Sequence, residues 1–124
     1  MPNVLVVDDE IGPRESLRMI LKPNYNVFTA EDGHAALQML GKAEMDVITL
    51  DLKMPGMSGV EVLRQIRSSE RLRRIPVVVI TSSSLDTDMR EALNAGADAF
   101  AHKAFDMVRF NREIHMLLTE WLHV

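Results

Sequence analysis

Acidic side chains stand directly after two of the aliphatic runs in this sequence, and their types could support chemistry. Asp8, Asp9 and Glu10 follow the first run, VLVV, and a single acid, Asp51, follows a later run, VITL. Carboxylates held a few ångströms apart repel one another and resist joint ionisation. A hard divalent cation relieves that repulsion, and Mg²⁺ prefers a few carboxylate oxygens together with water and phosphate.

A hydroxyl group and an ammonium group follow two other runs. Thr81 follows the run VVVI and begins a string of hydroxyl residues, and Lys103 follows a weaker run near the C-terminus. Both groups suit phosphoryl oxygens, so the whole set predicts phosphoryl transfer with one carboxylate as nucleophile. Asp51 is the best nucleophile candidate because it stands alone, and Asp8 and Asp9 are better placed as metal ligands.

The elements that must position these residues are predicted by an alternation of strand-like and helical patterns. Strand-like runs cover 4–7, 25–29, 47–50 and 77–80, with a weaker one at 97–101. Apolar residues with helical spacing lie between and after them: Leu17, Ile20 and Leu21 after Pro13; Ala36 and Leu40 before a stop at Gly41; Val62, Leu63 and Ile66 after the capping pair Ser58 and Glu61; Met89, Ala92 and Leu93 before a stop at Gly96; and Phe110, Ile114, Leu117, Leu118 and Trp121.

This alternation predicts an α/β fold, an open parallel sheet with helices on both faces and right-handed crossovers. It has too few units for an eight-fold barrel. Ligands of such sheets bind beyond the carboxyl ends of the strands, so the residues after the strands should share one edge. Taken alone, any one of these acids would more often cap a helix or lie in a solvated turn, but chance seldom brings such complementary groups to the ends of four strands.

Length and composition restrict the class of protein. A chain of 124 residues with 47% hydrophobic and 26% charged residues fits one globular domain. The net charge of -4 argues against direct contact with nucleic acid, and the lack of cysteine excludes thiolate chemistry. No run has the length of a membrane span and no secretory signal is visible, so we expect a cytoplasmic protein without a membrane partner.

The sequence resembles the receiver domain of two-component response regulators over essentially its whole length. The stretches VLVVDDE, DLKMPGMSG, VVVITSS and GADAFAHK carry the resemblance, in that order. It implies a flavodoxin-like (βα)5 fold with strand order 2-1-3-4-5. It also implies a single receiver domain over residues 1–124, which either stands alone or is excised from a longer regulator.

The resemblance implies a role for each site residue. Asp51 would accept a phosphoryl group from a histidine of a sensor kinase or a phosphotransfer protein. Mg²⁺ or Mn²⁺ would be bound by Asp51, by Asp9, by Asp8 directly or through water, and by the backbone carbonyl of Lys53. Lys103 would pair with the phosphoryl group. The implied function is a phosphoacceptor with slow self-dephosphorylation, not an enzyme.

The resemblance further implies a switch. Thr81 would bond to the phosphoryl group and move inward, and the ring of Phe100 would follow; core packing alone is the alternative for Phe100. The face formed by the fourth helix, fifth strand and fifth helix would then change and act on an output domain or partner, with homodimerisation through this face as a hypothesis. Ser82 is small, as the space beside the phosphate requires, and Lys53 and Ser83 would tune hydrolysis.

One departure concerns the residue after Lys103. Receivers usually carry proline there after a cis bond, and this chain has Ala104. A cis bond before a residue other than proline costs about 2.5–4 kcal/mol. We therefore expect an altered or mobile loop that still keeps Lys103 at the site.

Other classes of function are weighed against the receiver. A degenerate receiver would act without phosphate as an interaction adaptor. A Mg²⁺-dependent aspartyl phosphatase of the haloacid dehalogenase type needs an acid where Lys53 stands, and a flavodoxin would have its phosphate repelled by Asp8 and Asp9.

A basic cluster is interpreted as a solvated helix end and loop; its members are Arg64, Arg67, Arg71, Arg73 and Arg74.

Overall fold

The computed structural model describes residues 1–82, 85–103 and 107–122, and in them a single parallel sheet forms the centre of the molecule. Its strand order is β2-β1-β3-β4-β5. This is the predicted flavodoxin-like order, so the predicted fold is confirmed. The strands are β1 (Asn3–Val7), β2 (Asn26–Ala30), β3 (Val47–Leu50), β4 (Val77–Thr81) and β5 (Ala99–His102).

Two strands begin later than predicted because the first residue predicted for each one, Tyr25 or Ala97, completes a helix end. The Tyr25 amide donates to the Leu21 carbonyl at 3.0 Å, so Tyr25 closes the turn after the first helix. The Ala97 amide donates to the Ala92 carbonyl at 3.0 Å in the same manner. Backbone groups used in a helix end are not available to a strand.

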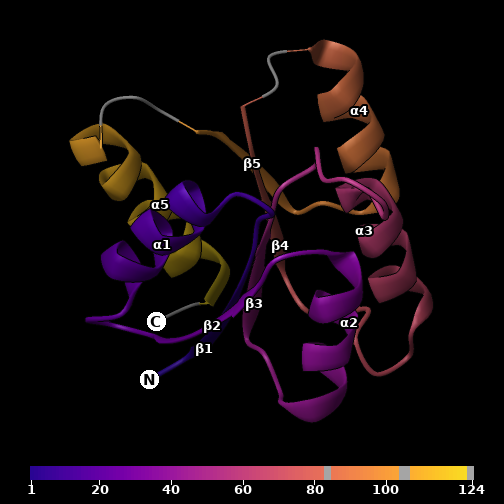
Figure 1. Cartoon of the computed structure of the whole chain (residues 1–124), viewed down its shortest axis with the longest axis horizontal. Coiled ribbons are helices and arrows are strands. Elements are labelled where there is room, and N and C mark those ends of the chain that lie inside the picture. Colours follow the sequence, from indigo (N-terminus) through magenta and orange to yellow (C-terminus); the bar gives the residue numbers. More distant parts are fainter. Residues whose placement is uncertain (83–84, 104–106, 123–124) are drawn as a thin grey trace.

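Helices cover both faces of the sheet, with α1 and α5 on one face and α2, α3 and α4 on the other (Figure 1). The core therefore has two layers. Val4, Val6 and Ile80 point toward α1 and α5, whereas Leu5 and Leu50 point toward α2 and α3. The helices are α1 (Ile11–Leu21), α2 (Gly33–Lys42), α3 (Gly59–Ser68), α4 (Asp86–Ala95) and α5 (Met107–Leu122).

The uninterrupted aliphatic runs form the inner strands because these strands are covered on both sides. Every residue of β3 and of β4 is buried. In an open sheet with helices on both faces, both alternating sets of side chains must be apolar. The edge strand β2 is the contrast: most of its residues are only partly buried.

Helix ends follow the capping signals in part. The Ser58 hydroxyl accepts a hydrogen bond from the Glu61 amide at 3.3 Å, as the capping pattern predicts. α4 ends at Gly96, whose φ of 111° lies in the left-handed region. The predicted stop at Gly41 is wrong, because α2 continues through Lys42 and is capped at Ala43.

The apolar pattern of the last helix is only partly described. Ile114 and Leu118 of α5 are fully buried, as the pattern predicts. The side chains of Phe110 and Trp121 lie outside the described part of the chain. Among the described residues, no helix combines the length and apolar character that crossing a membrane requires.

Candidate functional site

The residues that follow the strands meet at one edge of the sheet. Asp8 directly follows β1 and Asp51 directly follows β3, and the Asp51 amide donates to the Val7 carbonyl at 3.0 Å. Thr81 ends β4, and the Lys103 amide donates to the Thr81 carbonyl at 3.0 Å. Parallel register therefore brings together groups that are far apart in the sequence.

A cluster of carboxylates occupies this edge. Asp8, Asp9, Glu10 and Asp51 each offer one oxygen, and these oxygens all lie within 4.8 Å of one another. Asp8 and Asp51 are buried, with 6% and 4% of their surface exposed. Glu10 is exposed, but its amide donates to Asp8 Oδ1 at 3.0 Å and holds it beside the others.

Glu10 has no assigned role in the sequence-based prediction of the metal ligands. The only sequence signal for a role of Glu10 at the metal site was its position directly after Asp9. Because Glu10 is the last residue before α1, the chain turns there and the side chain faces back toward the cluster. That direction depends on the turn and could not be inferred from the run of acids alone.

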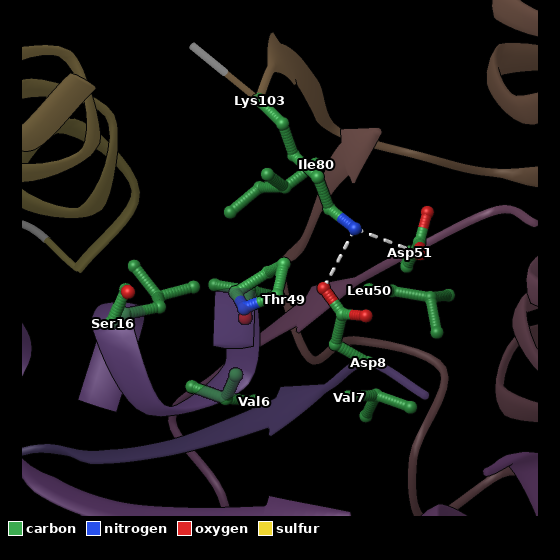
Figure 2. A pocket seen from close by; sticks show the side chains of 11 residues that line it. Val6, Val7, Asp8, Ser16, Thr49, Leu50, Asp51, Ile80 and Lys103 are labelled. Atoms are coloured by element: carbon green, nitrogen blue, oxygen red, sulfur yellow. Dashed lines mark hydrogen bonds and ion pairs between the residues drawn. The ribbon is translucent and has the colours of Figure 1, made fainter. Parts of the chain in front are cut away.

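Lys103 bridges the two buried acids. Its Nζ lies 2.8 Å from Asp8 Oδ2 and 3.0 Å from Asp51 Oδ2, and 3.9 Å from Glu10 Oε1. In Figure 2 the lysine side chain extends from the end of β5 and ends between the two carboxylates. The expected place of Lys103 thus agrees with the structure, whereas Ala104, and with it the loop prediction, lies outside the described residues.

The ionisation of Asp51 and Lys103 reflects burial and charge together. Burial raises the pKa of Asp51, and the charge of Asp8 adds to this, although bonds from Lys103 and the Lys53 amide oppose it. Burial by itself would lower the pKa of Lys103, but its bonds to Asp8 and Asp51 outweigh burial and raise that pKa. The lysine is therefore held as a cation between two acids that compete for it.

An apolar cavity of about 180 Å³ borders these ion pairs. The buried hydroxyl of Thr49 lines it and has no hydrogen-bond partner among the described residues. An apolar surrounding on this side is one reason that burial raises the pKa of Asp51. The cavity is lined by Val6, Val7, Asp8, Pro13, Ser16, Leu17, Thr49, Leu50, Asp51, Ile80 and Lys103 (Figure 2).

The loop after β3 bends sharply beneath Asp51. Gly56 has a φ of 75°, in the left-handed region, which fits the turn expected at the Pro-Gly pair. At Gly59 a Cβ atom would lie 2.2 Å from the Asp51 carbonyl oxygen and 2.7 Å from the Leu52 Cα atom. No side chain fits there, so this glycine lets α3 start directly against the end of β3.

The predicted switch residues lie on β4 and β5. Thr81 is fully buried, and Ser82 beside it is exposed. Phe100 is half-buried against a cluster that includes Val79 and Ala92, and its ring meets the His102 ring edge-on at a centroid distance of 5.6 Å. Ser83 lies outside the described residues.

The side chain of Lys53 points away from the carboxylates. Its amide donates to Asp51 Oδ1 at 3.3 Å, but its Nζ lies 3.3 Å from Asp88 Oδ2 on α4. Its backbone is thus next to the acidic cluster while its charge is elsewhere. The role of the Lys53 carbonyl as a metal ligand stays a prediction.

The donor set fits a hard divalent cation. All the clustered donors are carboxylate oxygens, the ligands that Mg²⁺ and Mn²⁺ prefer. Asp9 Oδ1 is buried and has no hydrogen-bond partner among the described residues, which is costly for an oxygen of an acid. One lysine cannot neutralise four acids, so a cation would relieve the remaining repulsion.

Two curated relatives are similar to most of this chain. Response regulator MprA of Mycobacterium leprae is 38% identical over 116 residues, 93% of this chain and 50% of that protein. Chemotaxis protein CheY of Pseudomonas aeruginosa is 35% identical over 104 residues, 82% of this chain and 84% of that protein. The chain thus spans about half the length of the MprA proteins that it matches.

A solved structure has the same fold. The receiver domain of the sensor histidine kinase PA1611 from Pseudomonas aeruginosa PAO1, crystallised with a magnesium ion coordinated in its active site cleft, superposes with a TM-score of 0.88. It is 26% identical, and the match covers 99% of this chain and 98% of that one. The profile of the response regulator receiver domain matches residues 4–115. The chain therefore belongs to the response regulator receiver domain family.

Proposed function

We propose that this receiver domain is a signalling switch in which Asp51 accepts a phosphoryl group from a histidine of a sensor kinase or phosphotransfer protein. The observation that supports this most strongly is the placement of Asp51: a buried carboxylate 3.0 Å from the Lys103 ammonium and within 4.8 Å of three further acids. An isolated structural acid has no need of such surroundings.

In the proposed transfer, an Asp51 oxygen forms a bond to phosphorus as the bond between phosphorus and the kinase histidine breaks. The departing imidazole nitrogen keeps the electron pair and takes up a proton from solvent. Asp51 must be ionised to attack, although burial raises its pKa. Lys103 opposes that effect of burial. Its ammonium lies beside Asp51 and would stabilise the negative charge that the phosphoryl oxygens carry after transfer.

Asp8, Asp9 and Asp51, with the backbone carbonyl of Lys53, would hold Mg²⁺ or Mn²⁺. A bound cation supplies positive charge that the phosphoryl oxygens need during transfer. The Asp9 oxygen, which has no hydrogen-bond partner among the residues that the structure describes, supports this set. The PA1611 receiver domain, which has a similar fold, was crystallised with a magnesium ion coordinated in its active site cleft. Glu10, the exposed member of the cluster, lies near enough to attract the cation from solvent.

The proposed response to phosphate involves β4 and β5. Thr81 would bond to the phosphoryl group, with the small Ser82 leaving space beside it, and Ser83 would affect hydrolysis. Phe100 packs on the α4 side of the sheet. A shift of Thr81 and of the Phe100 ring on the neighbouring strand would therefore alter the α4-β5-α5 face. A change of this kind is a shift in the populations of two conformations. The size of the shift is limited by the difference between the interaction free energies of the phosphoryl group in the two conformations.

We further propose that the domain dephosphorylates itself slowly and acts through that face on an output domain, a partner or a second copy. The chain covers only about half of the MprA proteins. A single receiver domain at residues 1–124 is therefore compatible with a stand-alone switch and with part of a longer regulator.

The test is labelling with acetyl phosphate or phosphoramidate, with and without Mg²⁺. We expect an acid-stable, base-labile adduct that needs the metal and is lost in Asp51→Asn. Asp46→Asn is the matched control, because Asp46 is an exposed acid whose Oδ2 accepts from the Asn3 amide, and an asparagine oxygen can do the same. Labelling that survives Asp51→Asn, or multiple turnover of an organic phosphate, would contradict the proposal.

A further inference from the structure

Lys53 connects the phosphoacceptor to α4. Its amide donates to Asp51 Oδ1 at 3.3 Å, and its Nζ lies 3.3 Å and 3.4 Å from the two carboxylate oxygens of Asp88. Asp88 belongs to the first turn of α4. One residue therefore touches the proposed site of phosphorylation with its backbone and a neighbouring helix with its charge.

The ion pair lies at the edge of a hollow between the loop after β3 and α4. The hollow has a volume of about 140 Å³. Side chains on opposite walls of this hollow do not pack against one another, and the ion pair is a direct contact that joins the loop to α4 here. The hollow is lined by Leu52, Lys53, Met54, Ser58, Val60, Asp88 and Glu91.

The two partners differ in freedom. The side chain of Asp88 is 14% exposed, whereas that of Lys53 is 63% exposed. The acid is thus fixed on the helix, and the flexible lysine can leave it at little cost. An ion pair with one exposed partner is weak, and a stronger anion nearby can compete for the cation.

Phosphorylation of Asp51 would supply that competing anion. A phosphoryl group carries more negative charge than the carboxylate it modifies, and it adds acceptor oxygens. The Lys53 backbone already touches Asp51, so its side chain is long enough to reach an oxygen attached there. One ammonium would then be shared between Asp88 and the phosphoryl group.

We propose that Lys53 and Asp88 form an ionic tether that holds the first turn of α4 to the phosphoacceptor loop, and that phosphorylation of Asp51 releases α4 by drawing the Lys53 ammonium to the phosphoryl oxygens. This rests on the proposed function of Asp51. It assigns to the charge of Lys53 a task separate from that of its backbone carbonyl, and it gives α4 its own connection to the site.

Linkage makes the tether measurable. If Asp88 and a bound phosphoryl mimic compete for one ammonium, removing the charge of Asp88 must tighten binding of the mimic. For an exposed ion pair we expect Asp88→Asn to lower the Kd of beryllofluoride in Mg²⁺ about two- to five-fold at low salt. High salt should reduce the effect because it screens exposed charges.

A double-mutant cycle separates the tether from general electrostatics. Lys53→Met should weaken binding of beryllofluoride, and in that background Asp88→Asn should change the Kd by less than its effect in the native sequence. Glu91→Gln is the control, because Glu91 lines the same hollow one helical turn along and forms no ion pair in the described structure. If Asp88→Asn acts equally with and without Lys53, or if Glu91→Gln acts equally strongly, the tether is refuted.

Hydrogen exchange provides a readout that does not need the phosphoryl mimic. In the unphosphorylated protein, Lys53→Met should speed amide exchange in the first turns of α4 and leave α2 unchanged. Unaltered exchange in α4 would overturn the tether. A native protein that does not bind beryllofluoride would instead contradict the proposed function of Asp51, and the exchange experiment would still decide about the tether.

Discussion

Replacing Asp9 with asparagine should stabilise the metal-free protein, although it removes a residue from the site. Asp9 Oδ1 is buried without a hydrogen-bond partner among the described residues, and Asp9 lies in a cluster of four acids. The structure pairs Lys103 with Asp8, Asp51 and Glu10. Asparagine keeps the size of the side chain and removes one of the repelling charges.

The separation of the acids sets the size of the effect. The clustered oxygens lie within 4.8 Å of one another, and two unit charges at that distance repel by about 0.9 kcal/mol at the dielectric constant of water and by about 3.5 kcal/mol at a value of 20. Asp9 is only half-buried, so the lower part of this range applies. We expect a gain of about 1–2 kcal/mol in the free energy of unfolding, or roughly 4–8 °C in Tm.

Urea unfolding followed by circular dichroism, with a chelator and then with millimolar Mg²⁺, measures the effect. Binding to the folded state alone stabilises a protein by about 2.7 kcal/mol when the ligand is at 100 times its Kd. We therefore expect Mg²⁺ to stabilise the native sequence and to do little for Asp9→Asn, which inverts the order of stabilities. Asp46→Asn, at the other edge of the sheet, should respond to Mg²⁺ as the native sequence does.

Two results would refute this reasoning. If Asp9→Asn were less stable than the native sequence without metal, its carboxylate would be making favourable contacts in place of repulsion. If Mg²⁺ stabilised both proteins equally, Asp9 would not be a ligand of the cation.

Three further predictions concern stability. Asp51→Asn should stabilise the metal-free protein at pH 7, because burial raises the pKa of Asp51 and its ionised form is disfavoured in the fold. The gain should shrink as the pH is lowered and should vanish below 3.8, where Asp51 of the native sequence is protonated in both the folded and the unfolded state. Gly59→Ala should lower the free energy of unfolding in urea by about 3 kcal/mol, because the added Cβ would lie 2.2 Å from the Asp51 carbonyl oxygen. Gly41→Ala, which has open space around the added Cβ, should raise it by about 0.5–1 kcal/mol. Equal effects of the two substitutions would contradict the steric account. Arg67→Met should lower Tm by an amount equivalent to about 2–3 kcal/mol without abolishing labelling of Asp51, because its guanidinium donates to the Gly96 and Ile75 carbonyls and to Asp98; an unchanged Tm would show these bonds to be unimportant.

The strand runs and the residues after them were predictable because local pattern and burial agree there. VLVV and VVVI are aliphatic throughout and VITL is aliphatic except for Thr49, and each forms a strand buried on both faces. The place of Asp8 and Asp51 follows from that pattern alone, since parallel strands end at the same edge. The Ser58 cap is a local signal of the same kind, and it agrees with the structure.

Arg67 is the counterexample. As part of a basic cluster, it was interpreted as solvated, but the structure places its guanidinium against the Gly96 carbonyl and Asp98, at the start of the strand pair β4 and β5. Asp98 Oδ2 also accepts from the Val77 amide at 2.8 Å. These partners lie up to 31 residues away along the chain, so no local pattern identifies them.

The α/β alternation, the edge at which the acids collect and the resemblance to the receiver family all follow from local patterns and motifs in the sequence. The packed fold was needed to show that Lys103 bridges Asp8 and Asp51, that Glu10 turns toward them and that the charge of Lys53 goes to α4. Secondary structure follows from the periodicity of neighbouring residues, which a sequence displays directly. The direction of a charged side chain depends instead on which of several distant partners it reaches once the strands and helices have packed.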